Sequence, residues 1–217
     1  MCGRYTLRTP LNVLAKQFRL DLGEAEAIKP RYNIPPTTEV LAVRHPRELA
    51  KLRWGLSPIW AKDTKIAYST INARVDTVAT KPAFRAAYKK RRCLILADGY
   101  FEWLKVEKAK QPILYEVDGG KPFAFAGLWE WWGGPEGENK PVESCTIITT
   151  DANELAKKVH DRMPVILDAD DYDDWLACMD VPLVPFPSDR MTARHVNSYV
   201  INVKNQGPQC VEPAPKD

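Results

Sequence analysis

The sequence lacks an apolar run long enough to cross a membrane. A membrane-spanning helix needs about 20 consecutive, mostly apolar residues, and the 217 residues contain no such run. The N-terminus also lacks the basic segment followed by an apolar stretch that marks a secretory signal. The chain is therefore predicted to stay in the cytoplasm and to have no membrane partner.

The signatures of common metal and cofactor sites are missing too. The cysteines are odd in number, lie far apart and include no Cys-x-x-Cys pair, which argues against a zinc site and a disulfide framework; they are Cys2, Cys93, Cys145, Cys178 and Cys210. Cys93 and Cys145 lie in apolar, strand-like runs and are interpreted as small core residues. There is no glycine-rich phosphate loop, His-Glu-x-x-His or Gly-x-Ser-x-Gly. The sequence thus predicts neither a metal nor an organic cofactor.

A strong excess of one charge is also absent. The 31 Lys and Arg residues against 28 Asp and Glu residues leave a net charge of +3. That excess is too small to establish a nucleic-acid partner, but it permits one if the basic residues cluster. The 45% hydrophobic and 27% charged residues are ordinary for a soluble globular protein.

What is present is an irregular succession of short helices and strands. Helical spacing or helix-start signals predict helices over residues 10–20, 82–90, 151–160 and 170–178. Apolar runs predict strands over residues 41–43, 52–54, 93–97, 113–117, 123–128 and 145–149, with a hairpin turn at 118–120. Because these elements do not alternate regularly, the expected class is α+β with a mostly antiparallel sheet. Residues from Asn205 onward are Pro-rich and polar and are expected to form a loose tail.

The most informative residues are the first four, Met1-Cys2-Gly3-Arg4. Removal of Met1, which the small Cys2 side chain favours, would leave an amine and a thiol on adjacent carbons. Their ordinary pKa values, about 8 and 8.5, keep both partly reactive near neutral pH. Such a 1,2-aminothiol can act as a hydrolase nucleophile, or it can capture an aldehyde as an imine that closes to a thiazolidine. The alternative is an ordinary cysteine in a disordered terminus.

Two further segments carry candidate acid–base groups. Glu102 lies among the aromatics of Asp98–Trp103, directly after a predicted buried strand, and an apolar setting raises a carboxyl pKa toward neutrality. His160 ends the predicted helix before Asp161-Arg162-Met163-Pro164, where it could transfer protons. The alternatives are a surface glutamate at a strand edge and a histidine interacting with a helix C-terminus.

Candidate binding residues lie between these segments. Asn72 and Arg74 are two residues apart, so an extended backbone would direct both to one face, the amide to orient a reacting oxygen and the guanidinium to hold a phosphate. Trp60 and Tyr68 lie in the same region, and exposed aromatics beside arginines suit stacking on single-stranded nucleic acid. Core packing is the alternative, and it is favoured for Trp54.

Taken together, these segments resemble the SRAP family (SOS response-associated peptidase), whose members are abasic-site processing proteins. The matching stretches follow the family order from Met1 to about residue 203: MCGRYT, RYNIPPT, RWGLSPIW, INARVDT, PAFR, RRCLILADGYFEW, FAFAGLWE and HDRMPVIL. One departure is Tyr100-Phe101, where Phe-Tyr is common; the swap could change which ring packs inward. The resemblance implies a single domain over residues 1–204 with a barrel-like, mostly antiparallel core and peripheral helices, followed by a flexible tail over residues 205–217.

The resemblance also implies a chemistry. Family members bind single-stranded DNA, and the mature Cys2 would capture the aldehyde of an abasic site as a thiazolidine crosslink, protecting the lesion during replication and the SOS response. The implied catalytic residues are Cys2, Asn72, Glu102 and His160. The implied DNA-binding residues are Arg4, Asn33, Trp60, Tyr68, Arg74 and Arg162. The protein is expected to act as a monomer, without metal or cofactor, and to associate with the nucleoid when bound to DNA.

Two other functions stay open at this stage. In the first, Cys2 is the nucleophile of a peptidase, with its own amine as base, and cleaves peptides or only the Met1–Cys2 bond. In the second, the protein is a non-catalytic single-strand binder, whose salt-sensitive affinity would depend neither on Cys2 nor on the lesion.

Overall fold

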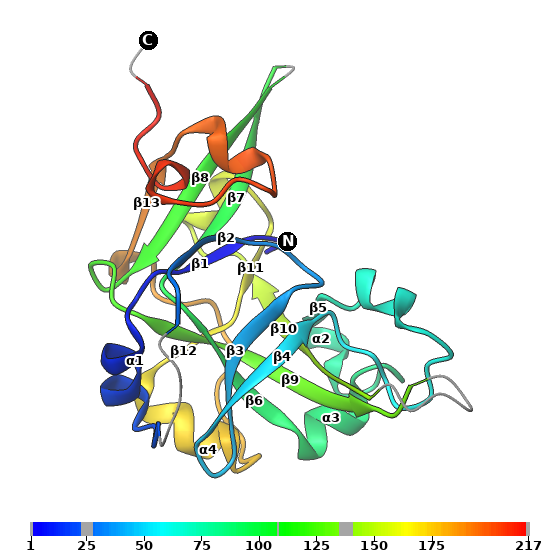
Figure 1. Cartoon of the computed structure of the whole chain (residues 1–217). Helices are drawn as coiled ribbons and strands as arrows, with labels where there is room; N and C mark the ends of the chain where they lie inside the picture. Colours follow the sequence, from blue (N-terminus) through cyan, green and yellow to red (C-terminus); the bar gives the residue numbers. More distant parts are fainter. Residues whose placement is uncertain (1, 23–27, 108, 135–140, 216–217) are drawn as a thin grey trace.

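The computed structural model describes residues 2–22, 28–107, 109–134 and 141–215, and its short helices lie around two β-sheets (Figure 1). The α-helices of this part of the chain are α1 (Leu11–Phe18), α2 (Val75–Val78), α3 (Arg85–Lys90) and α4 (Tyr172–Leu176). The spacing of Leu11, Leu14 and Phe18 predicted α1, and these three side chains are the ones it buries.

The larger sheet contains a closed barrel. Its strand order is β11 (Arg162–Pro164), β10 (Val142–Asp151), β4 (Glu48–Trp54), β3 (Glu39–Arg44), β6 (Arg92–Ala97), β9 (Phe123–Trp132) and β12 (Ile166–Leu167), with β5 (Asn72–Arg74) beside β10. Because β9 also pairs with β10, strands β10, β4, β3, β6 and β9 close on themselves. Within the described chain, β10 pairs in parallel with β4 and β5, and the other strand pairings are antiparallel. The predicted α+β class with a mostly antiparallel, barrel-like core is confirmed.

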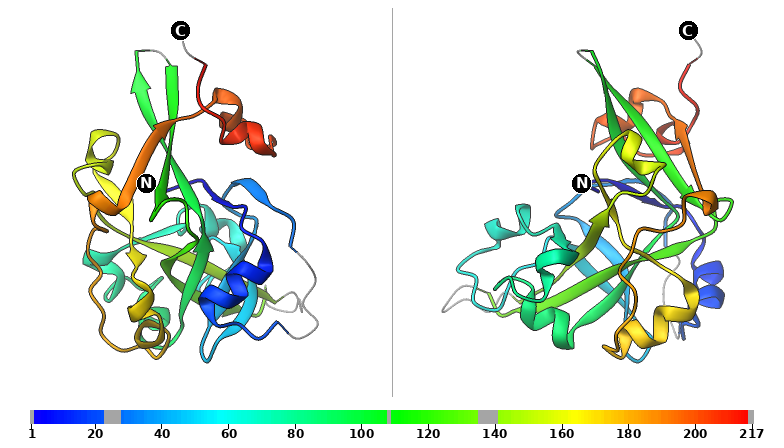
Figure 2. Two further views of the ribbon diagram at one scale, coloured as in Figure 1. Left: turned by 90° about the vertical axis from the view of Figure 1, so that its left-hand side faces the viewer. Right: turned by 180° about the vertical axis from the view of Figure 1, so that it is seen from behind.

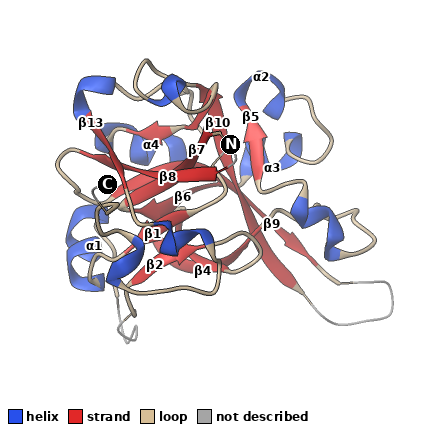
Figure 3. Cartoon of the chain, turned by 90° about the horizontal axis from the view of Figure 1, so that it is seen from above, coloured by secondary structure: helices blue, strands red, loops and turns tan. Residues whose placement is uncertain are grey.

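The second sheet lies against the barrel. Its order is β13 (Met191–His195), β8 (Ala109–Val117), β7 (Gly99–Val106), β1 (Tyr5–Leu7) and β2 (Arg31–Ile34). Alternate residues of β7 point to opposite faces. Tyr100 therefore packs in the main core, whereas Phe101 packs in a smaller cluster with Leu114, Val196 and Val200. Seen from above, the N-terminus lies close to β5 and β10 (Figure 3).

Aromatic contacts join the two sheets. Tyr5 of β1 meets Trp54 of β4 edge to face at 5.3 Å between ring centroids, and Phe125 of β9 at 5.7 Å. Such pairs add to the free energy gained from burying the rings. The indole nitrogen of Trp54 donates a hydrogen bond to the Ile71 carbonyl at 2.8 Å. The interpretation of Trp54 as a core residue is confirmed.

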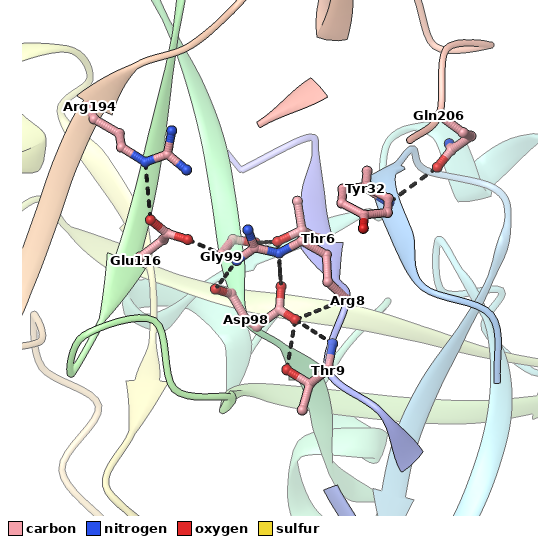
Figure 4. A network of polar contacts seen from close by, with 9 residues as sticks. All are labelled: Thr6, Arg8, Thr9, Tyr32, Asp98, Gly99, Glu116, Arg194 and Gln206. Carbon is pink, nitrogen blue, oxygen red and sulfur yellow. Dashed lines mark hydrogen bonds and ion pairs between the residues drawn. The ribbon is translucent and has the colours of Figure 1, made fainter. Parts of the chain in front are cut away.

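A polar network anchors the N-terminal strand to the second sheet (Figure 4). The buried Asp98 carboxylate accepts hydrogen bonds from the Thr6 hydroxyl at 2.6 Å, from Arg8 Nε at 3.0 Å, and from both the backbone amide and the hydroxyl of Thr9 at 2.8 Å. Arg8 also pairs with Glu116 of β8 at 2.8 Å. Hydrogen bonds to a buried carboxylate are among the stronger ones in proteins. The network therefore fixes the strand that begins three residues after Cys2.

Two sequence predictions of local structure are wrong. The turn at residues 118–120 does not close a hairpin, because β8 pairs with β7 and β13 while β9 pairs with β6, β10 and β12. It carries the chain from one sheet to the other. The helix predicted over residues 151–160 is also missing: β10 continues through Asp151, where it pairs with β11, and a single 3-10 turn follows at Ala156–Lys158. In the first part of this segment, pairing of β10 with β11 overrides the local helix signal.

The expectation of a loose C-terminal tail differs from the structure. Cys210 is buried in the smaller cluster, and Pro213 forms a bridge with Val196. Asn205 and Gln206 hydrogen-bond to Asn33, through the Asn205 carbonyl at 2.9 Å and the Gln206 amide at 2.7 Å. This segment covers the outer face of the second sheet, beside β7 and β8 (Figure 2). It therefore completes the fold rather than trailing from it.

Candidate active site

Cys2 lies in a closed environment at the junction of the two sheets. Its side chain is fully buried in the main core cluster. The Arg4 carbonyl accepts a hydrogen bond from the Phe101 amide at 2.9 Å, which holds the N-terminal segment along β7. From the barrel side, Asn72 of β5 donates its side-chain amide to the Cys2 carbonyl at 2.8 Å. The alternative of a disordered terminus is therefore wrong for Cys2.

The environment of Cys2 keeps its thiol neutral. Burial raises the pKa of the Cys2 thiol well above its ordinary value, and the negative charge of Glu102 raises it further. A thiolate is the reactive form of cysteine. Any reaction through the sulfur therefore requires a neighbouring group to accept its proton.

Glu102 on β7, which interacts electrostatically with the Cys2 thiol, is the candidate for that group. The residue is only 6% exposed, so the surface-glutamate alternative is wrong. Burial raises its pKa, and a nearby positive charge on His160 lowers it in part. A carboxyl group whose pKa is raised toward neutrality can both accept and return protons.

His160 lies at the mouth of the site, immediately before β11. Its Nδ1 accepts a hydrogen bond from the Arg162 backbone amide at 3.1 Å, which leaves the proton of the neutral ring on Nε2. An Asp161 carboxylate oxygen lies 2.7 Å from the same Nδ1 and would pair with the protonated ring. The side chain is about a third exposed, so His160 can meet a molecule arriving from solvent.

Asn72 brings a second polar atom to the site. Its Oδ1 is buried and has no hydrogen-bond partner among the described residues. The neighbouring Ala73 is buried whereas Asn72 and Arg74 are not, as the predicted alternation requires. Cys2, Asn72, Glu102 and His160, which are far apart in the sequence, are thus coupled in one site.

Two arginines and two carboxylates form a charged rim next to this site. Arg74 is exposed and pairs with Asp76 through Nη2 at 2.6 Å. Arg162 is nearly buried, donates to the Thr149 carbonyl at 2.6 Å and pairs with Asp151 at 2.8 Å. Asp76 also lies 3.6 Å from Arg162, so one carboxylate bridges both guanidinium groups. This rim could exchange its carboxylate for a phosphate.

Arg4 and Asn33 lie elsewhere. Arg4 is 8% exposed, donates to Asn33 Oδ1 at 2.6 Å and to the Val200 carbonyl at 3.1 Å, and stacks over Trp103. Asn33 is fully buried, and its amide nitrogen donates to three backbone carbonyls of residues 200–205. The predicted DNA contact through Asn33 is wrong, because a fully buried side chain cannot reach a strand. Arg4, which precedes β1, and Asn33 of β2 instead hydrogen-bond to carbonyl groups of the C-terminal segment.

The predicted stacking aromatics are on the surface. Trp60 is 57% exposed and Tyr68 is 70% exposed, and Ile59 beside Trp60 is exposed as well. Exposed apolar side chains that form a contiguous patch can mark a surface that binds a partner. Their position in the segment leading into β5 places them on the chain path toward Asn72 and Arg74.

The sequence reasoning missed a row of tyrosines beside Cys2. Tyr5, Tyr100 and Tyr115 are buried in the same cluster as Cys2, on neighbouring strands. The two-residue spacing of Tyr100 and Glu102 could have revealed that both share a face of β7. Because Tyr100 precedes Phe101 in the sequence, the tyrosine ring packs in the cluster that contains Cys2, and the phenylalanine ring packs in the smaller cluster on the opposite face.

The described part of the chain contains neither a candidate metal site nor a candidate membrane-spanning helix. No group of three His, Cys, Asp or Glu residues there could hold a metal ion. Among the same residues, no helix has the length and apolar character needed to cross a bilayer.

Comparisons with known proteins show the family to which the chain belongs. A family model described as SOS response associated peptidase (SRAP) matches residues 1–203. The chain belongs to the SRAP family. Its SRAP relatives include the abasic site processing protein YoqW of Bacillus subtilis, 42% identical over 98% of this chain and 99% of the relative. The abasic site processing protein HMCES of Xenopus tropicalis is 31% identical over 87% of this chain and 68% of the relative.

Solved structures share the SRAP fold described above. A protein of Bacteroides thetaiotaomicron is 25% identical and superposes with a TM-score of 0.88, covering 99% of this chain and 100% of that chain. A protein of Bordetella bronchiseptica is 28% identical with a TM-score of 0.76, over 90% of this chain and 100% of that chain. The closed barrel with its flanking sheet is therefore a fold known for SRAP-like proteins.

Proposed function

We propose that the mature protein, starting at Cys2, captures abasic sites in single-stranded DNA as a covalent thiazolidine crosslink. The observation that carries the proposal is the placement of Cys2: its carbonyl is held by Asn72 and its thiol is buried beside Glu102, whose pKa burial raises. Relatives named abasic site processing proteins, at about 40% identity over nearly the full length, support the same substrate.

The first step is attack by the amine. The ring-opened sugar of an abasic site carries an aldehyde at C1′. The Cys2 amine adds its lone pair to this carbon, and loss of water leaves an imine. Glu102 transfers the protons that this addition and dehydration require. His160, at the mouth of the site, assists the opening of the sugar ring, and the unpaired Asn72 Oδ1 orients the reacting groups.

The second step is ring closure by the sulfur. The thiol proton passes to the Glu102 carboxylate, the sulfur forms a bond to C1′, and the electrons of the C=N bond move to nitrogen, which takes the proton back from Glu102. The product is a five-membered ring, and no oxidant or reductant is consumed. Because the amine and the thiol belong to one residue, the second attack is intramolecular and therefore favoured.

The DNA strand lies across the charged rim. Arg74 and Arg162 bind its phosphates in place of the Asp76 and Asp151 carboxylates. Trp60 and Tyr68 stack on the bases that flank the lesion. An abasic nucleotide has no base to unstack, so turning its sugar into the site costs little.

The test is a denaturing gel. Purified protein, whose mass establishes a free Cys2 terminus, is mixed with a single-stranded oligonucleotide carrying one abasic site or with the intact strand. A heat-stable shifted band is expected only with the abasic strand. Cys2→Ala should keep DNA affinity but lose the band, whereas Cys178→Ala, a cysteine that none of the site contacts involve, should keep both.

Two results would overturn the proposal. If Cys2→Ala still formed the heat-stable band, the thiazolidine would be wrong. If the wild type formed no band but hydrolysed peptides in a manner blocked by Cys2 alkylation, the peptidase alternative would replace it.

A further inference from the structure

A row of three phenols lines the second sheet on the side of Cys2. Tyr5 lies opposite Tyr100 in the β1–β7 pair, and Tyr100 lies opposite Tyr115 in the β7–β8 pair. The rings of Tyr100 and Tyr115 are stacked, with centroids 4.9 Å apart and planes 12° apart. Tyr5, Tyr100 and Tyr115 are fully buried and share one cluster with Cys2.

The hydroxyl groups of these tyrosines have no hydrogen-bond partner among the described residues. Burying a hydroxyl without a partner is unfavourable, and phenylalanine would fill the same space without that cost. Tyr172 provides a contrast: it is also buried and stacked, on Phe18, but its hydroxyl interacts with the Ala124 backbone. An unpaired buried hydroxyl beside a reactive residue is available as a donor to charge that develops there during the reaction.

Tyr100 is the member of the row directed at the reacting groups. It is two residues from Glu102 on β7, so the two side chains share a face. The hydrogen bond from the Phe101 amide to the Arg4 carbonyl brings the N-terminal segment alongside this part of β7. Burial raises the pKa of Tyr100, and the neighbouring Cys2 and Glu102, when ionised, raise it further. Burial also raises the pKa of Tyr5, and Arg31 lowers it in part.

We propose that the Tyr100 hydroxyl donates a hydrogen bond to the Cys2 sulfur while the thiazolidine ring closes. This inference rests on the proposed function. In the closing step the thiol proton moves to Glu102, and negative charge develops on a sulfur that is shielded from water. The phenol proton stays on Tyr100 throughout, and its hydrogen bond stabilises the developing thiolate until the sulfur bonds to C1′. Tyr100 thereby acts on ring closure and not on the earlier attack by the amine.

The experiment separates the two steps. Wild type, Tyr100→Phe and the control Tyr172→Phe are mixed with the abasic oligonucleotide and sampled over time. One set of samples receives borohydride, which reduces any imine to a stable amine link; the other receives none, so only the closed ring survives heating. Hydrogen bonds to charged groups are the stronger ones, so Tyr100→Phe should close the ring about ten-fold more slowly, while borohydride-trapped crosslink forms at the wild-type rate.

The pH profile gives a second readout that a purely structural effect would not move. Loss of the donor should shift the pH dependence of ring closure in Tyr100→Phe to higher pH, because the thiolate is less stabilised. Tyr172→Phe should match the wild type in both rates and in the profile.

Each contrary outcome has a distinct meaning. Closure at the wild-type rate in Tyr100→Phe overturns the inference. Equal slowing of both steps, or the same slowing in Tyr172→Phe, also overturns it, because the effect would then be general destabilisation. If the wild type itself gives no crosslink with or without borohydride, the proposed function fails first.

Discussion

Replacement of Asp98 by Asn tests whether the polar network in Figure 4 holds the N-terminal strand in place. One carboxylate oxygen accepts from the Thr6 hydroxyl and Arg8 Nε, and the other accepts from the amide and hydroxyl of Thr9. An amide nitrogen in either position would face donors, and Arg8 would lose Asp98, the more buried of its two carboxylate partners, and keep only Glu116. Breaking a buried, hydrogen-bonded ion pair costs roughly 3–5 kcal/mol.

That cost is large compared with the total stability of a domain, roughly 5–15 kcal/mol. For a chain of this size each kcal/mol lowers Tm by roughly 2–4 °C, so Asp98→Asn should melt roughly 6–20 °C below the wild type. Differential scanning calorimetry at neutral pH measures the shift. Crosslinking should fall with it, because the same network positions the segment that carries Cys2.

The matched control is Asp118→Asn. Asp118 also pairs with an arginine, Arg190, through two hydrogen bonds, at 3.0 and 2.7 Å, but that pair is on the surface. Exposed ion pairs contribute about 0–1 kcal/mol, so its Tm should change by a few degrees at most. A melting temperature for Asp98→Asn within the range of this control would refute the assigned role of the network.

Three other variants test the site. Glu102→Gln should abolish crosslinking yet raise Tm at pH 8. The pKa of Glu102 is higher in the folded protein than in the unfolded chain, where it is about 4.3. Ionised Glu102 therefore destabilises the fold above that pH, and glutamine removes this cost. This gain should disappear as the pH is lowered to about 4, and a lower Tm at pH 8 would contradict it. Asp76→Asn removes the carboxylate that bridges Arg74 and Arg162. Fluorescence anisotropy should show that it binds intact single-stranded DNA about two- to five-fold more tightly at low salt. Weaker binding would mean that Asp76 orients the arginines instead. Trp60→Ala should leave Tm unchanged and weaken the same binding by about ten-fold, the loss of one base stack; an unchanged affinity would remove Trp60 from the DNA surface.

The parts of the fold that could be predicted were those with a local signal. The spacing of Leu11, Leu14 and Phe18 determines α1, and the unbroken apolar run of residues 93–97 determines β6. The turn at residues 118–120 carried an equally clear local signal, but a turn does not specify which strands pair across it. Pairing of β8 with β13 and of β9 with β6 and β12 decided that question. Pairing with the next strand, β11, extended β10 through Asp151 in place of a helix.

In the candidate site, too, residues with a local sequence signal could be predicted, and those whose surroundings come from other parts of the chain could not. Cys2, Glu102 and Asn72 were identified from their residue types and surroundings, and the structure brings them together. Asn33 has a side chain suited to DNA contact, but carbonyl groups from residues 200–205 surround it, and nothing near Asn33 in the sequence indicates them. Tyr100 was passed over because its ring looks like core packing, and only the folded structure shows that it shares a buried cluster with Cys2.

The hydrogen bond from Asn72 to the Cys2 carbonyl makes the site sensitive to the length of the chain as well as to its composition. The carbonyl that Asn72 holds belongs to the same residue as the amine of the proposed reaction. The hydrogen bond therefore fixes the position of residue 2, and the chain must begin at that residue for its amine to be free. An extra residue before Cys2 would leave the thiol in place but turn the amine into an amide, and loss of one residue would remove the thiol with it. Under the proposed capture by the Cys2 amine, a chain that keeps Met1 or carries a tag ahead of Cys2 should form no thiazolidine with an abasic strand.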